Sequence, residues 1–318
     1  MNRHLILGAD WPLPLIDDLV RILSGWRVTR WADASAEDIR AAAVIVPTHV
    51  RVDRALVEGG AVRLIHQFGV GVDNVDLPAM KALGVAVSNA PSEMSGMAAS
   101  VAEGAVLLVL SCARLPSLRA DNLAKGAWNW TMPLNFGLAR RRVGLVGLGS
   151  IGKAIARRLV AFDMKVTAVR RSKGAPDEAE AMGLDWIGAR DRLDELVETS
   201  DMVVICAPLN EATRGLFGAE LIGRMKPSAS LINVGRGGIV DEAALLAALD
   251  AGRLHAAGLD TISAEPPAPD SPLSAHRRIV LTPHDAGVTD KAFEGVAHVI
   301  RENLRRLEAG EPLLNRIV

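Results

Sequence analysis

Short apolar runs rich in β-branched residues recur along the chain, and longer segments with apolar residues at helical spacing lie between them. In the first third, the runs cover residues 4–7, 27–29, 43–46, 64–67 and 85–88. A second series covers residues 142–146, 165–169, 202–206, 230–234, 256–259 and 279–281. Because strands that alternate with helices build βαβ units, this pattern predicts an α/β protein with two doubly wound parallel-sheet domains.

Helical spacing is clearest in segments 15–23 and 35–41, in 100–110 and in about 291–308. The segment 100–110 joins the two series of runs and is apolar on nearly all sides, so we expect it to be buried between domains or subunits. Gly310 follows the last segment and is a typical helix stop signal.

The composition fits two globular domains that each bury a core. The chain has 318 residues, of which 49% are hydrophobic and 23% charged, and its formal net charge is −1. No polybasic surface is indicated, so nucleic acid is not an expected partner. Cys112 and Cys206 lack metal-ligand spacing, so we expect no metal site and no disulfide framework. The apolar segments fall short of the roughly 18 residues of a membrane span, and the first is too short for a signal peptide, so we expect a cytoplasmic protein.

A glycine-rich turn after the run at 142–146 carries the most specific signal in the chain. The sequence Gly147-Leu-Gly149-Ser-Ile-Gly152 follows a predicted strand and opens an alanine-rich helical segment. In this setting Gly147 permits a tight turn, Gly149 lets the backbone approach a pyrophosphate, and Gly152 allows close packing of helix on strand. The amides of Ser150 and Ile151 would then bind the anion at the helix N-terminus. The alternative is a glycine-rich turn without a ligand.

The residues after the run at 165–169 bear on which dinucleotide the turn takes. A turn for NAD expects Asp or Glu at this strand end to bind the ribose 2′-hydroxyl. The chain has Arg170, Arg171, Ser172 and Lys173 instead. A basic cluster attracts a 2′-phosphate that a carboxylate would repel, so the sequence predicts NADP(H) in preference to NAD(H). The alternative is that the arginines form a solvated strand end.

Charged side chains follow three of the later runs. Arg236 follows 230–234, Asp260 and Glu265 follow 256–259, and His284 follows 279–281. Since the carboxyl ends of parallel strands share one edge of a sheet, we expect these residues to converge on one crevice. Taken alone, His284 would more often be a structural histidine, and Arg236 and Glu265 ordinary strand-end or loop residues.

Such a set fits the reduction of a ketone by a hydride. Hydride addition develops negative charge on the ketone oxygen, which needs a proton donor that titrates near neutrality, as histidine does. In this interpretation His284 is the donor, and Glu265 bonds its other ring nitrogen and fixes the tautomer. Arg236 can bind a substrate carboxylate and polarise the carbonyl group.

Two further motifs are Gly-Val-Gly-Val-Asp-Asn-Val-Asp at 69–76 and Ser-Val-Ala-Glu at 100–103. The order of all these motifs resembles the D-isomer-specific 2-hydroxyacid dehydrogenase family, which includes glyoxylate/hydroxypyruvate reductases and D-3-phosphoglycerate dehydrogenases. The resemblance covers essentially the whole chain. It implies a Rossmann cofactor domain over residues 99–285, inserted in a discontinuous, flavodoxin-like substrate domain of residues 1–98 and 286–318.

The resemblance also implies a role for each matching residue. Arg236, Glu265 and His284 would be catalytic, and the amides of Val70 and Gly71 would bind the substrate carboxylate together with Arg236 and His284. The implied cofactor contacts are Gly147, Gly149, Ser150, Ile151, Gly152, Arg170, Arg171, Ser172, Cys206, Pro208, Thr213, Val234, Asp260 and His284. Among them, Asp260 would orient the nicotinamide carboxamide, while the residues from Cys206 to Thr213 would line the adenosine side.

Three positions bear on the substrate. Met97 stands where the family commonly has Asn, which bears on the hinge or the pocket. Gln67 stands where a basic residue is frequent, which argues against a phosphorylated substrate, and Glu265 in place of Gln argues against a formate dehydrogenase. We therefore expect an NADPH-dependent reductase that converts glyoxylate, hydroxypyruvate or pyruvate to the D-2-hydroxy acid. The alternatives are an NAD-dependent dehydrogenase for a bulkier acid and a dinucleotide-sensing binding protein with longer flanking segments.

The family resemblance implies a homodimer formed through the helix near 100–110. Trp128 and Trp130 follow this helix, and exposed tryptophans often mark contacts between proteins. We hypothesise that one of them reaches the rim of the partner's active site. The alternative is that both pack against their own domain.

Overall fold

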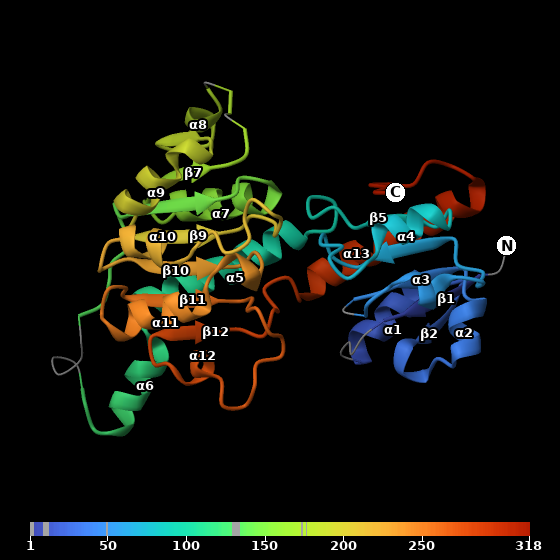
Figure 1. Cartoon of the computed structure of the whole chain (residues 1–318), viewed down its shortest axis with the longest axis horizontal. Coiled ribbons are helices and arrows are strands. Elements are labelled where there is room, and N and C mark those ends of the chain that lie inside the picture. The colour runs from blue at the N-terminus through green and yellow to red at the C-terminus, as the bar shows by residue number, and fades with distance from the viewer. Residues whose placement is uncertain (1–2, 9–12, 49, 129–133, 173, 176) are drawn as a thin grey trace. The chain divides into compact units, whose positions relative to one another are not determined.

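The chain folds as two compact units (Figure 1), and the computed structural model describes residues 3–8, 13–48, 50–128, 134–172, 174–175 and 177–318. Unit 1 combines Met1–Ala98 with Val288–Val318, and unit 2 is Ala99–Gly287. The expected second boundary, at 286, differs from the observed one by two residues. Unit 1 is therefore discontinuous in sequence, and the whole of unit 2 lies between its two segments.

Unit 1 is built on a five-stranded sheet whose paired strands all run parallel. Its strands are β1 (His4–Leu7), β2 (Arg27–Arg30), β3 (Val44–Val46), β4 (Leu64–Gln67) and β5 (Ala86–Asn89). Their order in the sheet is β2-β1-β3-β4-β5, which is the order of flavodoxin-like doubly wound sheets.

Helices cover both faces of this sheet (Figure 1). They are α1 (Leu13–Ile22), α2 (Ala36–Ala41), α3 (Arg54–Val57), α4 (Leu77–Ala82) and α13 (Asp290–Ala309), with a 3-10 turn at Trp31–Asp33. Leu5 and Leu7 of β1 pack in one cluster with α1 and α13, whereas Ile6 packs in the opposite cluster with α3 and α4. A strand buried on both faces reads as an apolar run, as β1 and β3 do, whereas the edge strand β2 is only partly buried and reads Arg-Val-Thr-Arg.

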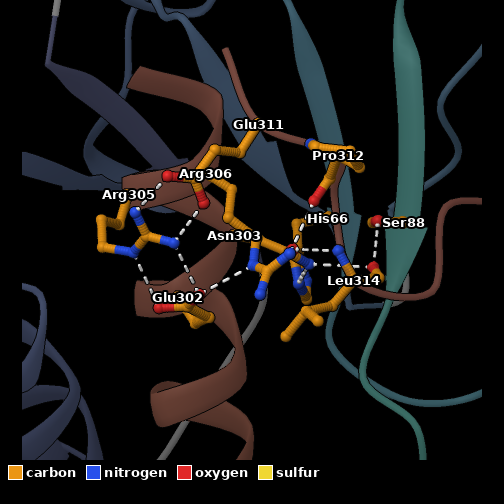
Figure 2. Close-up of polar contacts among 9 residues, drawn as sticks. All are labelled: His66, Ser88, Glu302, Asn303, Arg305, Arg306, Glu311, Pro312 and Leu314. Atoms are coloured by element: carbon orange, nitrogen blue, oxygen red, sulfur yellow. Dashed lines mark hydrogen bonds and ion pairs between the residues drawn. The ribbon is translucent and has the colours of Figure 1, made fainter. Parts of the chain in front are cut away.

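The C-terminal tail is attached to the edge strand β5 and to α13, as Figure 2 shows. Ser88 forms an antiparallel bridge with Arg316, and its hydroxyl donates to the carbonyl of Leu314 at 2.8 Å. Asn303 of α13 bonds both backbone groups of Leu314, and its Nδ2 lies 2.9 Å from Nε2 of the buried His66. The tail therefore covers the edge of the sheet, which would otherwise present unpaired backbone groups.

Unit 2 is built on a seven-stranded parallel sheet. Its strands are β6 (Arg142–Val146), β7 (Lys165–Val169), β8 (Trp186–Gly188), β9 (Met202–Ile205), β10 (Ser230–Asn233), β11 (Ala256–Leu259) and β12 (Ile279–Leu281). Their order is β12-β11-β10-β9-β6-β7-β8, which is the Rossmann order with one strand added beyond β11. The order reverses between β6 and β9, and open α/β sheets bind ligands at such a point, outside the carboxyl ends of the strands.

The two sheets confirm the predicted fold class, but the apolar runs did not predict β8. This strand has three residues, pairs with β7 at the edge of the sheet, and buries only Gly188. It reads Trp-Ile-Gly and contains one β-branched residue, whereas the equally short edge strand β12 reads Ile-Val-Leu and gives a recognisable apolar run. The other strands agree with the predicted runs to within one residue at each end.

The helices of unit 2 also lie on both faces of its sheet. They are α5 (Met97–Arg114, in unit 2 from residue 99), α6 (Pro116–Ala124), α7 (Ser150–Val160), α8 (Glu178–Ala181), α9 (Leu193–Thr199), α10 (Ala219–Arg224), α11 (Glu242–Asp250) and α12 (Pro272–Ala275), with 3-10 turns at Arg190–Arg192 and Gly237–Ile239. The helices α9, α10 and α11 share one apolar cluster with the sheet. On the other face α5 packs so closely on β11 that a Cβ on Gly258 would lie 3.0 Å from the Cβ of Leu108.

The helix α5 is longer than the predicted segment 100–110 and less completely buried. Leu108 and Val109 are buried, but Leu107 is 56% exposed. Among the described helices, α5 is the one whose length and apolarity would suffice to cross a membrane, although half of it is buried inside the structure. Core helices of globular domains pass the same test, and the close packing of α5 on β11 is that of a core helix.

Candidate active site

The glycine-rich turn between β6 and α7 has the geometry that a dinucleotide requires. Gly147 has a φ of +107°, and a Cβ there would lie 2.9 Å from the backbone that follows β9. A Cβ on Gly152 would lie 2.4 Å from the Gly147 carbonyl oxygen, so the turn and the helix approach this closely only without a side chain. Gly149 is the N-cap of α7, and its Cβ would meet no atom within 4 Å. Ser150 and Ile151 form the first turn of α7, where backbone amides can bind an anion.

The residues predicted for the adenosine side follow β9, and Val234, a further predicted cofactor contact, follows β10. The Cys206 thiol donates to the Gly147 carbonyl at 3.0 Å, and burial raises the pKa of this thiol to about 12. Cys206 therefore supports the turn as a neutral group. The Thr213 hydroxyl donates to the Pro208 carbonyl at 2.7 Å, and Val234 is buried just after β10. The structure thus brings these residues to the carboxyl edge of the sheet, and their contacts with a cofactor stay a prediction.

Arg170 follows β7 as predicted, but its guanidinium group is already engaged within unit 2. Its Nη1 and Nη2 donate to the two carboxylate oxygens of Glu178 at 3.0 and 2.5 Å. Its Nε donates to the Ser172 carbonyl at 3.0 Å. Arg171 and Ser172 are exposed, and Lys173 lies outside the described residues. The basic cluster therefore contains a carboxylate, that of Glu178, which the sequence pattern did not indicate.

His284 and Glu265 meet beyond the carboxyl ends of β11 and β12. The Nδ1 atom of His284 lies 2.7 Å from Oε2 of Glu265, and the two side chains are 35% and 36% exposed. A small molecule can therefore reach the pair. Because a carboxylate faces Nδ1, proton exchange with a ligand would use the other ring nitrogen, Nε2.

The carboxyl group of Glu265 is held in its ionised form. Burial acts to raise its pKa, but the hydrogen bond and charge of His284, the Ile262 amide and the charge of Arg236 together lower the pKa below its ordinary value. The Ile262 amide donates to Oε1 of Glu265 at 3.0 Å. A Cβ on Gly237 would lie 1.9 Å from the Ile262 carbonyl carbon, so only a glycine lets the segment after Arg236 reach this loop. The three predicted catalytic residues therefore belong to one electrostatic cluster.

Asp260 anchors the loop that carries His284. Its Oδ1 accepts hydrogen bonds from the Thr282 hydroxyl at 2.7 Å and from the amides of Asp285 and Ala286 at 3.1 and 3.2 Å. Its backbone carbonyl accepts from the His284 amide at 2.9 Å. His284 has a φ of +54°, in the left-handed region that favours glycine, so its backbone must be held by such contacts.

The sequence pattern did not indicate this positioning role of Asp260 and missed Thr282. Burial raises the pKa of the Asp260 carboxyl, although its hydrogen bonds act in the opposite direction. Thr282 stands two positions before His284, but the sequence gives no way to distinguish it from any other loop threonine. The contact of Asp260 with a nicotinamide carboxamide stays a prediction.

Val70 and Gly71 lie in the segment after β4 of unit 1. Within the described part of the chain neither of their amides donates a hydrogen bond, while the Val70 carbonyl accepts one from Asn89 Nδ2 at 2.5 Å. Two such amides are suited to bind a carboxylate. Gln67, at the end of β4, is buried and donates from Nε2 to the Thr48 carbonyl at 3.2 Å.

Three further positions were singled out in the sequence. Met97 is the first residue of α5. Trp128 is 74% exposed, and Trp130 lies outside the described residues, so a contact of either with a partner stays a prediction. In the described ranges, no group of three His, Cys, Asp or Glu side chains is arranged to hold a metal ion.

The strand order of unit 2, its glycine-rich turn and the His284–Glu265 pair define a Rossmann-type unit with an acid–base pair at its ligand-binding edge. Residues 106–286 match the family model described as D-isomer specific 2-hydroxyacid dehydrogenase, NAD binding domain. Over 319 residues the chain is 36% identical to glyoxylate/hydroxypyruvate reductase B of Cronobacter sakazakii, covering 96% of this chain and 94% of the relative. The chain belongs to the D-isomer-specific 2-hydroxyacid dehydrogenase family, as its resemblance implied.

A solved structure and a second relative extend the comparison. The NADPH-dependent glyoxylate/hydroxypyruvate reductase of Sinorhizobium meliloti, in complex with NADP and malonate, superimposes with a TM-score of 0.83 at 28% identity, covering 100% of this chain and 97% of that one. The D-3-phosphoglycerate dehydrogenase of Archaeoglobus fulgidus is 34% identical over 276 residues, which are 86% of this chain and 51% of the relative. The chain spans about half the length of the D-3-phosphoglycerate dehydrogenases that it matches.

Proposed function

We propose that the chain reduces a small, unphosphorylated 2-keto acid, such as glyoxylate, hydroxypyruvate or pyruvate, to the D-2-hydroxy acid with NADPH. The observation that carries this proposal is the 2.7 Å contact between His284 Nδ1 and Glu265 Oε2 at the ligand-binding edge of a Rossmann sheet. A histidine oriented by an ionised carboxylate is the group that a ketone reduction needs for its proton.

The proposed roles follow from the chemistry of each group. A nicotinamide dinucleotide held at the glycine-rich turn would supply the hydride for the keto carbon. His284 donates a proton from Nε2 to the oxygen on which negative charge develops, and Glu265 fixes the ring and balances its charge. Arg236 binds the substrate carboxylate and polarises the carbonyl. The amides of Val70 and Gly71 are proposed as further donors to that carboxylate.

The proposed preference for NADPH is supported by the basic residues Arg170 and Arg171 where NAD-binding turns carry an acid. The Sinorhizobium meliloti relative, which is described as NADPH-dependent, makes this choice reasonable. One charge-assisted contact to phosphate contributes about 1.5–3 kcal/mol, which corresponds to roughly a ten- to hundredfold preference.

Steady-state kinetics with both cofactors tests this preference. We expect a higher kcat/KM for NADPH than for NADH in the wild type, and the reverse in Arg170→Asp, because the substitution replaces attraction by repulsion. Equal values in the wild type, or an unchanged ratio in the variant, would show that Arg170 does not read the phosphate.

The proposed substrate class rests on Gln67, a neutral residue where the family often has a basic one. Without a cation at this position, less positive charge is available to offset the free-energy cost of removing the phosphate group of a phosphorylated keto acid from water. The test is NADPH oxidation at about 340 nm, the absorbance of the reduced cofactor, with a panel of keto acids. Turnover with the three small acids and not with phosphohydroxypyruvate is expected. If the protein binds the cofactor but oxidises no NADPH with any of the acids, a dinucleotide-sensing protein would be favoured instead.

We also propose a homodimer formed through α5 and the segment after it. Leu107, Leu123, Trp128 and Leu134 are large apolar residues that are exposed in unit 2, and such residues are typical of subunit contacts. Light scattering at micromolar concentration should report a dimer for the wild type and a monomer for Leu107→Glu. A wild-type monomer would refute this assembly.

A further inference from the structure

The end of β7 is the position where a dinucleotide-binding turn places the group that contacts the ribose 2′ position. The residue there is Arg170, and the Gly147 amide of the dinucleotide turn donates to the carbonyl of Val169, immediately before it, at 2.9 Å. The chain thus lacks an acid at the strand end itself. A carboxylate nevertheless lies at this place, because Glu178 of α8 bonds to Arg170.

The ion pair between Arg170 and Glu178 is bidentate and partly buried. Both terminal nitrogens of the guanidinium bond the carboxylate, and the two side chains are only 22% and 21% exposed. Lys153, on the first turn of α7 just after the glycine-rich turn, lies 3.3 Å from Oε1 of Glu178. The hydrogen bond from Arg170 is the main reason that the pKa of Glu178 lies below its ordinary value, so the carboxylate is ionised at neutral pH. Two cations beside the dinucleotide turn therefore share one internal anion.

We propose that Glu178 is a specificity-determining residue that competes with the 2′-phosphate of NADP(H) for Arg170 and Lys153. This inference rests on the proposed function in one respect only, that a nicotinamide dinucleotide binds at this turn. A 2′-phosphate needs the same guanidinium fork that Glu178 already occupies, and two anions cannot share it without repulsion. The 2′-hydroxyl of NAD(H), in contrast, can donate to the Glu178 carboxylate and leave the ion pair intact.

A purely structural ion pair makes a different prediction. If Glu178 only fastened α8 to β7, its removal would affect ligands with and without a 2′-phosphate in the same way. The ratio of the two affinities therefore separates the two roles, whereas overall stability or overall activity does not.

The experiment measures the binding of 2′,5′-ADP and of 5′-AMP to the full chain by isothermal titration calorimetry. The variants are Glu178→Gln, which keeps the shape and removes the charge, and Glu178→Ala, which also removes the acceptor. The control is Glu180→Gln on the same short helix, where the side chain is exposed. We expect both Glu178 variants to bind 2′,5′-ADP about tenfold more tightly than the wild type, which is the scale of one charge-assisted contact. Affinity for 5′-AMP should change little in Glu178→Gln, whose amide oxygen still accepts from the 2′-hydroxyl, and should fall in Glu178→Ala, which has no acceptor. The control should change neither affinity.

Two results would overturn the inference. One is an affinity ratio in both Glu178 variants that equals the wild-type ratio. The other is that neither nucleotide binds at millimolar concentration, since no ribose would then lie near Glu178. Because the titration uses no keto acid, its outcome does not depend on turnover. A protein that reduces no keto acid but shows the shifted ratio would refute the proposed reaction and leave the role of Glu178 standing.

Discussion

His66 in unit 1 and His284 in unit 2 are the same residue type in opposite environments. His66 is fully buried, its Nδ1 lies 3.1 Å from the Gln67 carbonyl, and burial lowers its pKa to about 4. His284 is about one-third exposed, and its Nδ1 faces the ionised Glu265. A fully buried histidine has no access to a ligand with which to exchange a proton, whereas one paired with a carboxylate at a ligand-binding edge can deliver a proton. The surroundings, not the residue type, separate the two roles.

Removal of the exposed ring of His284 should have the largest effect. In His284→Ala we expect kcat to fall by about 10²–10⁴-fold, the usual contribution of a general acid, with little change in cofactor affinity. Turnover and cofactor binding are measured together, and His298→Ala, at an exposed position of α13, serves as the control. A His284 variant with wild-type turnover would end the assignment.

The buried ring should instead govern the pH dependence of stability. The folded-state pKa of about 4 lies below the ordinary value of 6.5, so between these values the unfolded chain binds a proton that the folded chain does not. The free energy of unfolding should therefore decrease as the pH falls from 6.5 to 4, by up to about 3 kcal/mol.

Urea unfolding at pH 7 and pH 4.5 measures this effect. His66→Gln should be less stable at pH 7, because the contact with Asn303 changes, but should lose much less of its stability on acidification. His298→Gln should keep the wild-type pH dependence. A His66 variant with the full wild-type dependence would assign the effect to other groups.

The smallest predicted effect concerns the anchor of the active histidine. Thr282→Val removes the hydroxyl that donates to Asp260 at 2.7 Å, and a hydrogen bond to a charged group contributes about 1.5–3 kcal/mol. Only part of this free energy affects the orientation of the His284 ring. We therefore expect kcat to fall roughly tenfold with the KM for cofactor nearly unchanged. Thr282→Ser keeps the hydroxyl and should retain most of the activity. Equal loss in both variants would point to packing rather than to the hydrogen bond.

Much of this architecture could be predicted because parallel strands buried on both faces leave unbroken apolar runs. Most strands of the two sheets follow from such runs. The edge strand β8 was missed because it reads Trp-Ile-Gly, whereas the equally short edge strand β12 reads Ile-Val-Leu and was recognised. The glycine-rich turn was equally recognisable, since Gly147 and Gly152 stand where any side chain would collide with backbone.

The polar network of the site was predictable only in part. His284 and Glu265 could be named because they follow strands whose carboxyl ends meet at one sheet edge and because the order of the motifs resembles the family. The contacts of Glu178 with Arg170 and of Thr282 with Asp260 depend on how the intervening loops run, and no periodicity encodes that path. These contacts hold Arg170 and Asp260, so the partners of two predicted site residues were not indicated by the sequence.

We propose that this chain binds NADPH and a 2-keto acid, donates the proton, and forms the D-2-hydroxy acid. The most direct measurement is the stoichiometry and handedness of the product from hydroxypyruvate and NADPH, followed by chiral chromatography. We expect one equivalent of D-glycerate for each equivalent of NADPH oxidised. Formation of L-glycerate, or no product although the dinucleotide is bound, would contradict this proposal.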